Sequence, residues 1–433
     1  MLKKRYFILL SLFIICTSFF TGAFCLFTNY KSYSLRAVTG LWAEDPNLFE
    51  AFAVYSADDT SLTFYKRSSI PAVNDIFNGK TVTAVYTGIE NMQIQTSEDI
   101  PWYTDNYSKS ITQVTVEDLI APSSISYWFY YAKKCSTFDL EKLDTSRTTS
   151  MRKTFYHASD SVPSVVLDLT HWDTSQVTSM DGMFYYMGSN KNIENFQLDL
   201  SNWNVSNVNS FNQMFQCAGQ YAPSWSVGDL RTKVITRSNG STYHAWDVSN
   251  AENFNAMFSC VGEGADDFTL DVSNWNISNA TSLSRMFSAL RRNKDGAVIE
   301  MDFRTKSVEL EDGTTYTAWD LSAYSGLLYY MFAYAGKNAR SFKIDLGNWN
   351  ISNVTSTKEM FHGTASNASE FSLGDLSVWN TGNVTDMEAM FMDAGKNADW
   401  SLDLTGWDTS NVTSYISFAS GVADKVAYLP FSK

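Results

Sequence analysis

The sequence predicts an α/β fold, in which a solenoid of short parallel strands and short helices follows a β-rich N-terminal cap. The main observation is a repeated phrase, seen most clearly in Leu198-Asp-Leu-Ser-Asn-Trp-Asn-Val-Ser-Asn-Val-Asn-Ser-Phe-Asn-Gln-Met-Phe215. The phrase recurs eight or nine times between Leu140 and Phe418, and its tryptophan returns at intervals of roughly 30 residues. Each copy is too short to bury its own apolar side chains, so the copies are expected to stack.

The first 27 residues predict an export signal, either a cleaved signal peptide or a retained signal anchor (residues 1–27). Three basic residues precede an apolar run from Tyr6 to Phe20, and Thr21-Gly-Ala23 offers small residues for cleavage. The apolar character continues to Phe27, and about 20 apolar residues can span a bilayer, so the anchor stays open. Either alternative places the rest of the chain outside the cell, secreted or at the cell surface.

Residues 28–125 do not repeat and predict the β-rich cap. Runs rich in β-branched and aromatic residues, at 50–56, 61–66, 81–86 and 111–117, predict four strands. A stacked array needs such a cap because its first coil would otherwise expose an apolar face. Residues 126–418 then form the predicted repeat solenoid of about nine coils, and residues 419–433 form a C-terminal cap.

Each repeat predicts one strand, one corner and one short helix. Leu167, Asp168 and Leu169 alternate as in a strand with one buried face, and Trp172 fills the corner after it. The asparagine four residues after the tryptophan, Asn207 in the next coil, predicts a ladder of amide hydrogen bonds. Methionine and phenylalanine at helical spacing (positions 180, 183, 184 and 187) predict the helix, with the methionines packed in the core.

Two coils carry the same insertion, at residues 231–245 and 304–318. Each insertion consists of two short β-prone runs around Asn239-Gly240 or Asp312-Gly313, which predicts a β-hairpin. The insertion recurs in alternate coils, which indicates duplication of a two-coil block. Projecting loops of repeat proteins often carry partner-specific contacts, so Asn239 and Asp312 are candidate binding residues.

A column of aspartates is the second candidate site. An aspartate stands four residues before most of the tryptophans, so stacked strands would align these carboxylates roughly 5 Å apart. The candidate binding residues in this column are Asp168, Asp199, Asp271, Asp345, Asp375 and Asp403. Repulsion of about 1 kcal/mol per pair in water favours a compensating divalent cation or basic ligand. In the alternative, each aspartate only accepts hydrogen bonds from nearby backbone amides.

Charge and cysteine content limit the function classes. The chain has 32 Lys and Arg against 46 Asp and Glu, a net charge of -14, which argues against binding of nucleic acid or anionic membrane. Contact with a membrane is expected only through the N-terminal segment. Beyond that segment, Cys135, Cys217 and Cys260 are too few for a disulfide-stapled scaffold. Cys217 and Cys260 occupy the same repeat position, and both a disulfide and two buried thiols stay open.

The repeat also resembles that of a known family. Its consensus, Trp-Asp-Thr-Ser-Asn-Val-Thr-x-Met-x-x-Met-Phe, is similar to the repeat of the BspA-like leucine-rich-repeat surface proteins, also known as a mycoplasma-lipoprotein-associated repeat. Segments 53–66, 80–86 and 127–129 resemble the lead-in that often precedes it, so the resemblance covers most of residues 50–418. It implies a leucine-rich-repeat-like solenoid, export, surface display and adhesion, and it assigns no catalytic residue.

The sequence therefore predicts an exported surface protein that binds or adheres to an extracellular protein or polysaccharide. An enzyme is not expected, nor is a cofactor or a metal site. The four histidines share no metal-ligand spacing, and no motif pairs a nucleophile with a base. The alternative is a structural role, in which the molecules assemble into a surface layer without a specific ligand.

Overall fold

The structure is a computed structural model of the chain and describes residues 49–427. The chain divides into two compact units. One unit comprises residues 1–50 and 67–69, and the other comprises residues 51–66 and 70–433. The second unit contains the repeats and both hairpin insertions.

Some predicted segments lie outside the described residues. These are the signal peptide or signal anchor of residues 1–27, residues 28–48 of the predicted cap and residues 428–433 of the predicted C-terminal cap. Within residues 49–427, no helix has the length and apolar character that crossing a membrane requires.

The first sheet has five strands in the order β5-β1-β2-β6-β7. The strands are β1 (Glu50–Ser56), β2 (Ser61–Arg67), β5 (Ala84–Thr87), β6 (Gln113–Val116) and β7 (Thr137–Asp139). A short antiparallel pair, β3 (Ile76–Phe77) and β4 (Lys80–Thr81), lies between β2 and β5 in the sequence. β1 and β5 are antiparallel, whereas β2, β6 and β7 pair in parallel. The sheet therefore changes from antiparallel to parallel pairing before the repeats begin. Parallel pairing requires long connections between strands, which the repeats supply.

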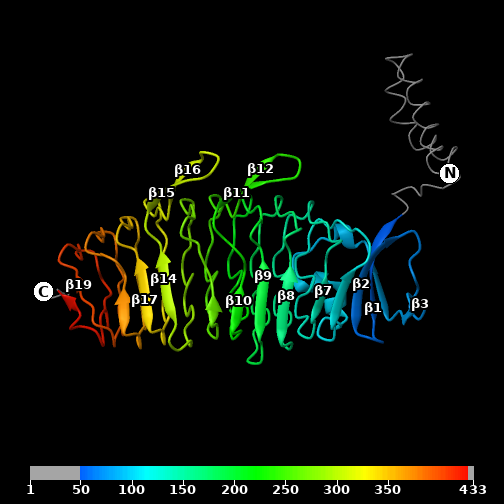
Figure 1. Cartoon of the computed structure of the whole chain (residues 1–433), viewed down its shortest axis with the longest axis horizontal. Helices are drawn as coiled ribbons and strands as arrows, with labels where there is room; N and C mark the ends of the chain where they lie inside the picture. Colours follow the sequence, from blue (N-terminus) through cyan, green and yellow to red (C-terminus); the bar gives the residue numbers. More distant parts are fainter. Residues whose placement is uncertain (1–48, 428–433) are drawn as a thin grey trace, which may run out of the picture. The chain divides into compact units, whose positions relative to one another are not determined.

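The repeats continue with one strand per coil, and neighbouring coils lie side by side (Figure 1). A four-stranded parallel sheet contains β8 (Ser164–Asp168), β9 (Asn195–Asp199), β10 (Ser224–Ser226) and β13 (Asp267–Phe268). A three-stranded parallel sheet contains β14 (Val298–Asp302), β17 (Ser341–Asp345) and β18 (Glu370–Ser372). The last pair is β19 (Leu402–Asp403) and β20 (Val426–Ala427).

The predicted fold class, an α/β leucine-rich-repeat solenoid with short helices, is wrong. The described residues form several small β-sheets. Their helices are the four-residue α3 (Pro101–Thr104) and the three-residue 3-10 helices η2 (Ile89–Asn91) and η3 (Ser97–Asp99), all of which precede the repeats. The methionine and phenylalanine segment of each repeat, predicted as a helix, is a series of turns.

Left-handed residues explain why these segments are not helical. In the coil of Met183, the backbone angle φ is positive at Gly182 and at Tyr186, four residues later. The same two positions are left-handed in the following coils, at Gln213 and Cys217, Ala256 and Cys260, Arg285 and Ala289, Tyr330 and Tyr334, Glu359 and Gly363, and Ala389 and Asp393. An α-helix needs φ near -63° at every residue, so a left-handed residue at every fourth position prevents it.

The turns form hydrogen bonds both within their own coil and to the next coil. The amide of Met183 donates to the Met180 carbonyl in its own coil, at 3.1 Å. The amide of Phe184 donates to the Met214 carbonyl of the following coil, at 2.9 Å. Alternate amides thus close a turn or pair with the neighbouring coil, so this buried segment is hydrogen-bonded without a helix.

Two aromatic columns run through the core beside the turns. Phe184 and Phe215 stack at 5.5 Å between ring centres, and Trp172 and Trp203 stack at 6.2 Å. The indole Nε1 of Trp203 also donates to the Leu169 carbonyl of the preceding coil, at 3.0 Å. The tryptophan is therefore both a large core side chain and a hydrogen-bond link between coils.

The predicted asparagine position forms a third link, on the surface. The Nδ2 atom of Asn207 donates to the Ser175 carbonyl at 2.7 Å, and Asn250 donates to Ser206 in the same way. The side chains satisfy carbonyl groups of the preceding coil, whereas the sequence predicted partners for buried amides. Cys135, Cys217 and Cys260 are free thiols, so the disulfide alternative for the last two is not realised in this structure.

Candidate functional site

The aspartate column lies at the ends of the strands, where each member closes a turn. The Oδ1 atom of Asp168 accepts a hydrogen bond from the amide two residues later at 2.9 Å, and that of Asp199 does so at 3.0 Å. The same contact is made by Asp271, Asp345, Asp375 and Asp403. The register of β8 and β9 pairs Asp168 with Asp199, so the structure does bring these carboxylates together. Each therefore has a local role in closing a turn.

Local hydrogen bonds lower the pKa of three members of this column. The Thr170 hydroxyl and amide hold the pKa of Asp168 below its usual value. The Ser377 hydroxyl has the same effect on the pKa of Asp375, and the Thr405 amide on the pKa of Asp403. These carboxylates are ionised at neutral pH and form a stripe of negative charge. No group of three or more His, Cys, Asp or Glu residues in the described part of the chain is arranged to hold a metal ion.

Two further aspartates, Asp229 and Asp302, belong to the column in the hairpin-bearing coils. Asp302 is the register partner of Asp345 and receives hydrogen bonds from Arg304 Nε at 3.0 Å and Lys306 Nζ at 2.8 Å. Arg304 also lies 3.8 Å from Asp345, with its Nε atom beside Oδ2. The base of the hairpin thus supplies positive charge to the acidic stripe.

The other hairpin repeats this arrangement around Asp229. Arg231 Nε donates to Asp229 at 3.0 Å and lies 3.8 Å from Asp271, and Lys233 Nζ contacts Asp229 at 3.1 Å. Burial raises the pKa of Asp229, but the hydrogen bonds from Arg231 and Lys233 outweigh it and lower the pKa to about 2. Sequence reasoning missed these pairs, although the repeated Arg-Thr-Lys at the start of each insertion was a visible signal.

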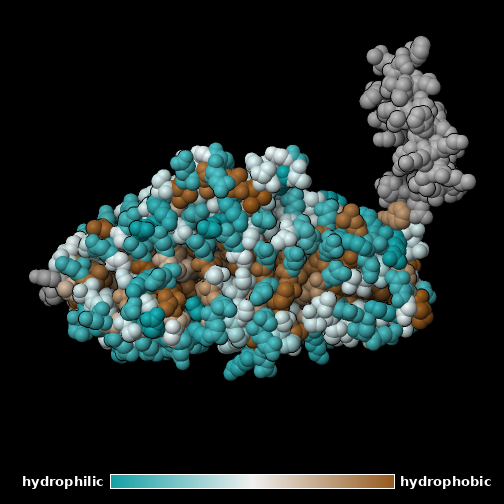
Figure 2. Space-filling view, in the orientation of Figure 1, coloured by the Kyte–Doolittle hydropathy of each residue, from teal (hydrophilic) through white to brown (hydrophobic). Residues whose placement is uncertain are grey.

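Both insertions form the predicted hairpins, which project from the same side of the repeats (Figure 1). The first consists of β11 (Lys233–Thr236) and β12 (Thr242–Ala245), and the second of β15 (Lys306–Glu309) and β16 (Thr315–Ala318). One face of each hairpin packs against the core, through Ile235 and Tyr243 or Val308 and Tyr316. Figure 2 shows hydrophobic residues where the hairpins join the repeats, and further hydrophobic residues along the middle of this face.

The opposite faces of the hairpins form a polar surface. The hairpin surface comprises Val234, Thr236, Thr242, His244, Ser307, Glu309, Thr315 and Thr317. It presents five hydroxyl-bearing side chains, which can donate and accept hydrogen bonds. The tyrosines of the inner faces hold the hairpins in place, because Tyr243 Oη donates to the Asn202 carbonyl at 2.5 Å and Tyr316 Oη to the Asn274 carbonyl at 2.7 Å.

The two hairpins touch each other. Asp312, in the turn of the second hairpin, lies 2.8 Å from His244 Nε2 on the first. Contact with His244 is the leading cause of a lowered pKa for Asp312, at about 2. Asn239, the other predicted turn residue, accepts hydrogen bonds from the amide and hydroxyl of Ser241 and is exposed. The structure therefore joins Asp312 to the first hairpin and gives Asn239 a turn-closing role.

A small groove lies beneath the first hairpin. Its volume is about 190 Å³, and its lining includes His171, Asp173, Asn204, Arg237 and Tyr243. The Arg237 guanidinium stacks 4.8 Å from the centre of the Tyr243 ring. The groove is polar and too small for more than part of a ligand, so it extends the hairpin surface and does not form a separate enclosed site.

The comparisons with known proteins agree with a repeat protein. A family model described as Mycoplasma protein of unknown function, DUF285, matches residues 123–245, 235–309 and 327–424, which together make up more than half of the chain. Searches of curated proteins and of solved structures found no match. The three matched segments follow the repeats that the sequence displays. The chain therefore belongs to the DUF285 family of Mycoplasma repeat proteins of unknown function.

Proposed function

We propose that the protein is an exported binding module that contacts an extracellular protein or polysaccharide through its hairpin surface. One observation carries the proposal. The two hairpins are the parts of the described repeats that depart from the common coil, yet each is built in the same way and anchored by a tyrosine hydrogen bond. A projecting hairpin that appears twice and that the other coils lack is the kind of loop in which repeat proteins place partner contacts.

The export signal predicted for residues 1–27 and the resemblance of the repeat to BspA-like surface proteins support an extracellular location. The hydroxyl groups of the hairpin surface suit hydrogen bonding to protein backbone or to sugar hydroxyls. Ion pairs fix the direction of each hairpin at its base. Asp229 pairs with Arg231 and Lys233, and Asp302 pairs with Arg304 and Lys306. Binding therefore uses a surface already ordered before the partner arrives, which lowers the entropic cost.

The test shortens both hairpins without disturbing their bases. Replacing residues 235–243 and 308–316 by Asn-Gly joins the register pairs Val234–His244 and Ser307–Thr317 through two-residue turns. The residues 28–433 product and the shortened variant are compared for binding to immobilised extracellular matrix proteins and polysaccharides. We expect the variant to lose at least about tenfold in affinity. Its coils should stay folded, at a melting temperature lowered by the lost core contacts of Ile235, Tyr243, Val308 and Tyr316. Equal binding by the two proteins contradicts the proposal.

The structural alternative is supported by a different observation. Ile416, in the last repeat, is 73% exposed, and Tyr415 beside it is 46% exposed. Exposed apolar residues at the end of a stack can mediate assembly between copies of the chain. Concentration-dependent assembly that is lost in the Ile416→Ser variant, together with no binding to the panel of ligands, would favour a surface-layer role.

A further inference from the structure

Among the described strands the ladder of the repeats is interrupted between β7 and β8, between β18 and β19, and between β13 and β14, where the interruption opens into a cleft. β13 pairs with β10, and β14 pairs with β17, but the sheets contain no pairing between β13 and β14. The coils themselves remain adjacent at this junction, because Phe287 stacks on Phe332 at 5.5 Å. The Phe287 amide also donates to the Met331 carbonyl at 2.9 Å. The stack is therefore closed on its turn side and open on its strand side.

Two side chains lie at the ends of the opening. The position held by Leu200 and Leu346 in other coils is held by Phe303 here, and its ring packs edge-on against Trp319 at 4.7 Å. At the other end of the opening, the buried Arg291 donates from Nη2 to the Ala265 carbonyl at 2.8 Å and from Nη1 to the Val298 carbonyl at 3.3 Å. A guanidinium placed between two strands keeps them from pairing directly.

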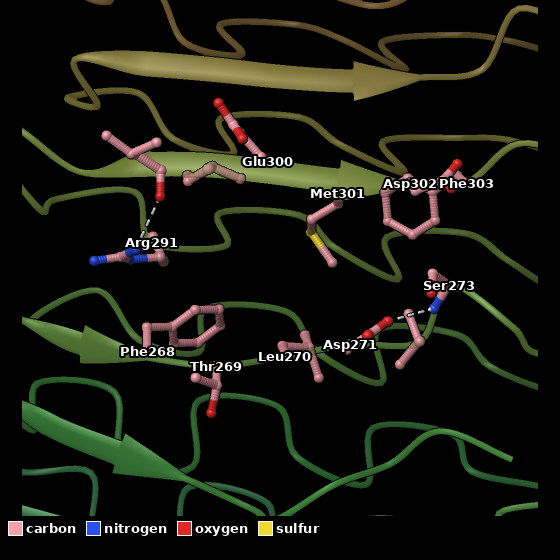
Figure 3. A pocket seen from close by; sticks show the side chains of 13 residues that line it. Phe268, Thr269, Leu270, Asp271, Ser273, Arg291, Glu300, Met301, Asp302 and Phe303 are labelled. Atoms are coloured by element: carbon pink, nitrogen blue, oxygen red, sulfur yellow. Dashed lines mark hydrogen bonds between the residues drawn. The ribbon is translucent and has the colours of Figure 1, made fainter. Parts of the chain in front are cut away.

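The opening is a cleft of about 430 Å³. Phe268, Leu270 and Met301 lie between the two strands, at the floor of the cleft (Figure 3). These side chains are only partly buried, whereas the matching positions in closed coils, such as Leu198, are buried. The cleft therefore exposes apolar surface that belongs to the core.

The cleft also exposes the polar edge of β14. The Ala297 carbonyl accepts hydrogen bonds from residues 340 and 341 and so faces β17. Because backbone groups alternate along a strand, the amides and carbonyls of Val298, Glu300 and Asp302 face the cleft. In the described structure, none of these three amides donates to a backbone carbonyl. Of the three carbonyls, that of Val298 accepts a hydrogen bond from Arg291. An unpaired edge above an apolar floor is the arrangement to which an added strand binds.

The charge at the rim indicates which strand fits. Asp271 and Glu300 line the cleft and are exposed. On the paired edge of β14, the register partner of Glu300 is Lys343, which stands between Phe342 and Ile344 of β17. On its paired edge β14 thus meets an extended strand whose apolar residues enter the core and whose outward residue is a lysine, although the Lys343 Nζ itself pairs with Glu370 of β18 at 2.6 Å.

We propose that the cleft between β13 and β14 binds an extended, basic peptide segment of a partner protein, which pairs with the free edge of β14. The peptide places its apolar residues against Phe268, Leu270 and Met301 and its base beside Glu300. Arg291 gives up its contact with Val298 when the peptide binds. This site goes beyond the hairpin surface, and the shortened-hairpin variant keeps it, so the two proposals fail independently.

The probe is a fluorescein-labelled peptide that copies residues 340–346, Arg-Ser-Phe-Lys-Ile-Asp-Leu. Fluorescence anisotropy with the residues 28–433 product is expected to show saturable binding. The same peptide with N-methyl groups on alternate backbone amides keeps its side chains but loses its strand-pairing donors, and is expected to bind at least about tenfold more weakly. Equal binding by the methylated peptide, or no binding by either, overturns the proposal.

Two variants of Glu300 separate backbone pairing from charge. Glu300→Pro removes the amide that faces the cleft, and an edge position tolerates proline better than a paired one. We expect this variant to bind at least about tenfold more weakly, whereas Glu300→Ala, which keeps the amide, loses only about threefold. If Glu300→Pro fails to fold, amide exchange of the unaltered protein decides: bound peptide must slow exchange at Val298, Glu300 and Asp302. Unchanged exchange there contradicts the proposal.

Discussion

The junctions β8–β9 and β13–β14 join consecutive coils of the same repeat, but only the first is closed. β8 and β9 share five register pairs, their coils stack Trp172 on Trp203, and Asn207 bonds across to Ser175. At β13–β14 there is no strand pairing among the described strands, and the asparagine position is occupied by Ala323. The phenylalanine column and the turn ladder continue through both junctions.

The comparison shows which interactions hold the stack together. The turn side, with its buried phenylalanines and its alternating hydrogen bonds, is present at every junction described above. The strand side can open because its edge groups are then solvated by water and need no protein partner. Coil cohesion and sheet formation are therefore separable in this protein, and the open junction can serve for binding.

The largest expected effect comes from breaking the closed junction. Trp203 is fully buried, stacks on Trp172 and donates to the Leu169 carbonyl. Trp203→Ala is expected to lower the free energy of unfolding by about 3–5 kcal/mol, measured by urea denaturation. Trp203→Phe, which keeps a ring but loses the Nε1 donor, should cost less. A loss below about 1 kcal/mol for the alanine variant would show that the tryptophan column does not hold the coils.

The next effect concerns the bridge across the open junction. Arg291→Ala removes two hydrogen bonds from a charged donor to the Ala265 and Val298 carbonyls. We expect the free energy of unfolding to fall by about 1–3 kcal/mol. Lys294→Ala, which removes an exposed ion pair with Asp266 in the same coil, is the control and should change it by less than about 1 kcal/mol. Equal effects of the two variants would contradict a bridging role for Arg291.

A smaller effect should come from extending the asparagine ladder through the open junction. Ala323 is exposed and holds the position from which Asn279 and Asn353 bond to the preceding coil. Ala323→Asn is expected to add a hydrogen bond to the Ser278 carbonyl and to stabilise the protein by about 0.5–1 kcal/mol, seen as a higher melting temperature. Ala323→Asp has the same shape but no donor, so it should give no gain. Equal gains would point to another cause.

The last prediction concerns pH and the loop that leads into β13. Glu263 is buried, and burial raises the pKa of its carboxyl although Gln220 and Asn293 hydrogen-bond to it. A raised carboxyl pKa means that this group favours the folded state most below the pKa of the unfolded chain and loses that effect as pH rises through the folded value. Glu263→Gln should therefore gain stability relative to the unaltered protein between pH 4 and pH 8, measured by urea denaturation. A difference that is constant with pH would contradict this.

Much of the candidate site could be predicted, but its charge balance could not. The aspartate column follows from a fixed offset to the tryptophan, and the hairpins follow from Asn239-Gly240 and Asp312-Gly313. The pairing of Arg231 with Asp229 depends on how the chain bends at the base of the insertion. The contact of His244 with Asp312 joins residues of different coils, and no spacing in the sequence encodes it.

The helix prediction failed for a physical reason. Met180, Met183, Phe184 and Met187 point to one side in a helix, but they also point to one side in a series of four-residue turns. The two structures differ in the sign of φ at positions such as Gln213, Arg285 and Glu359, which are ordinary side chains with no preference for the left-handed region. Hydrogen bonds to the next coil compensate the strain, and these exist only after stacking.

The sequence by itself determined the period, the strand positions, the aromatic columns and the two hairpins, because each depends on residue type at a fixed spacing. Only the tertiary structure decided the turn conformation and the opening between β13 and β14. Both depend on how one coil meets the next: alternate amides bond to the neighbouring coil, and Phe303 and Arg291 separate two strands that the repeat alone would pair.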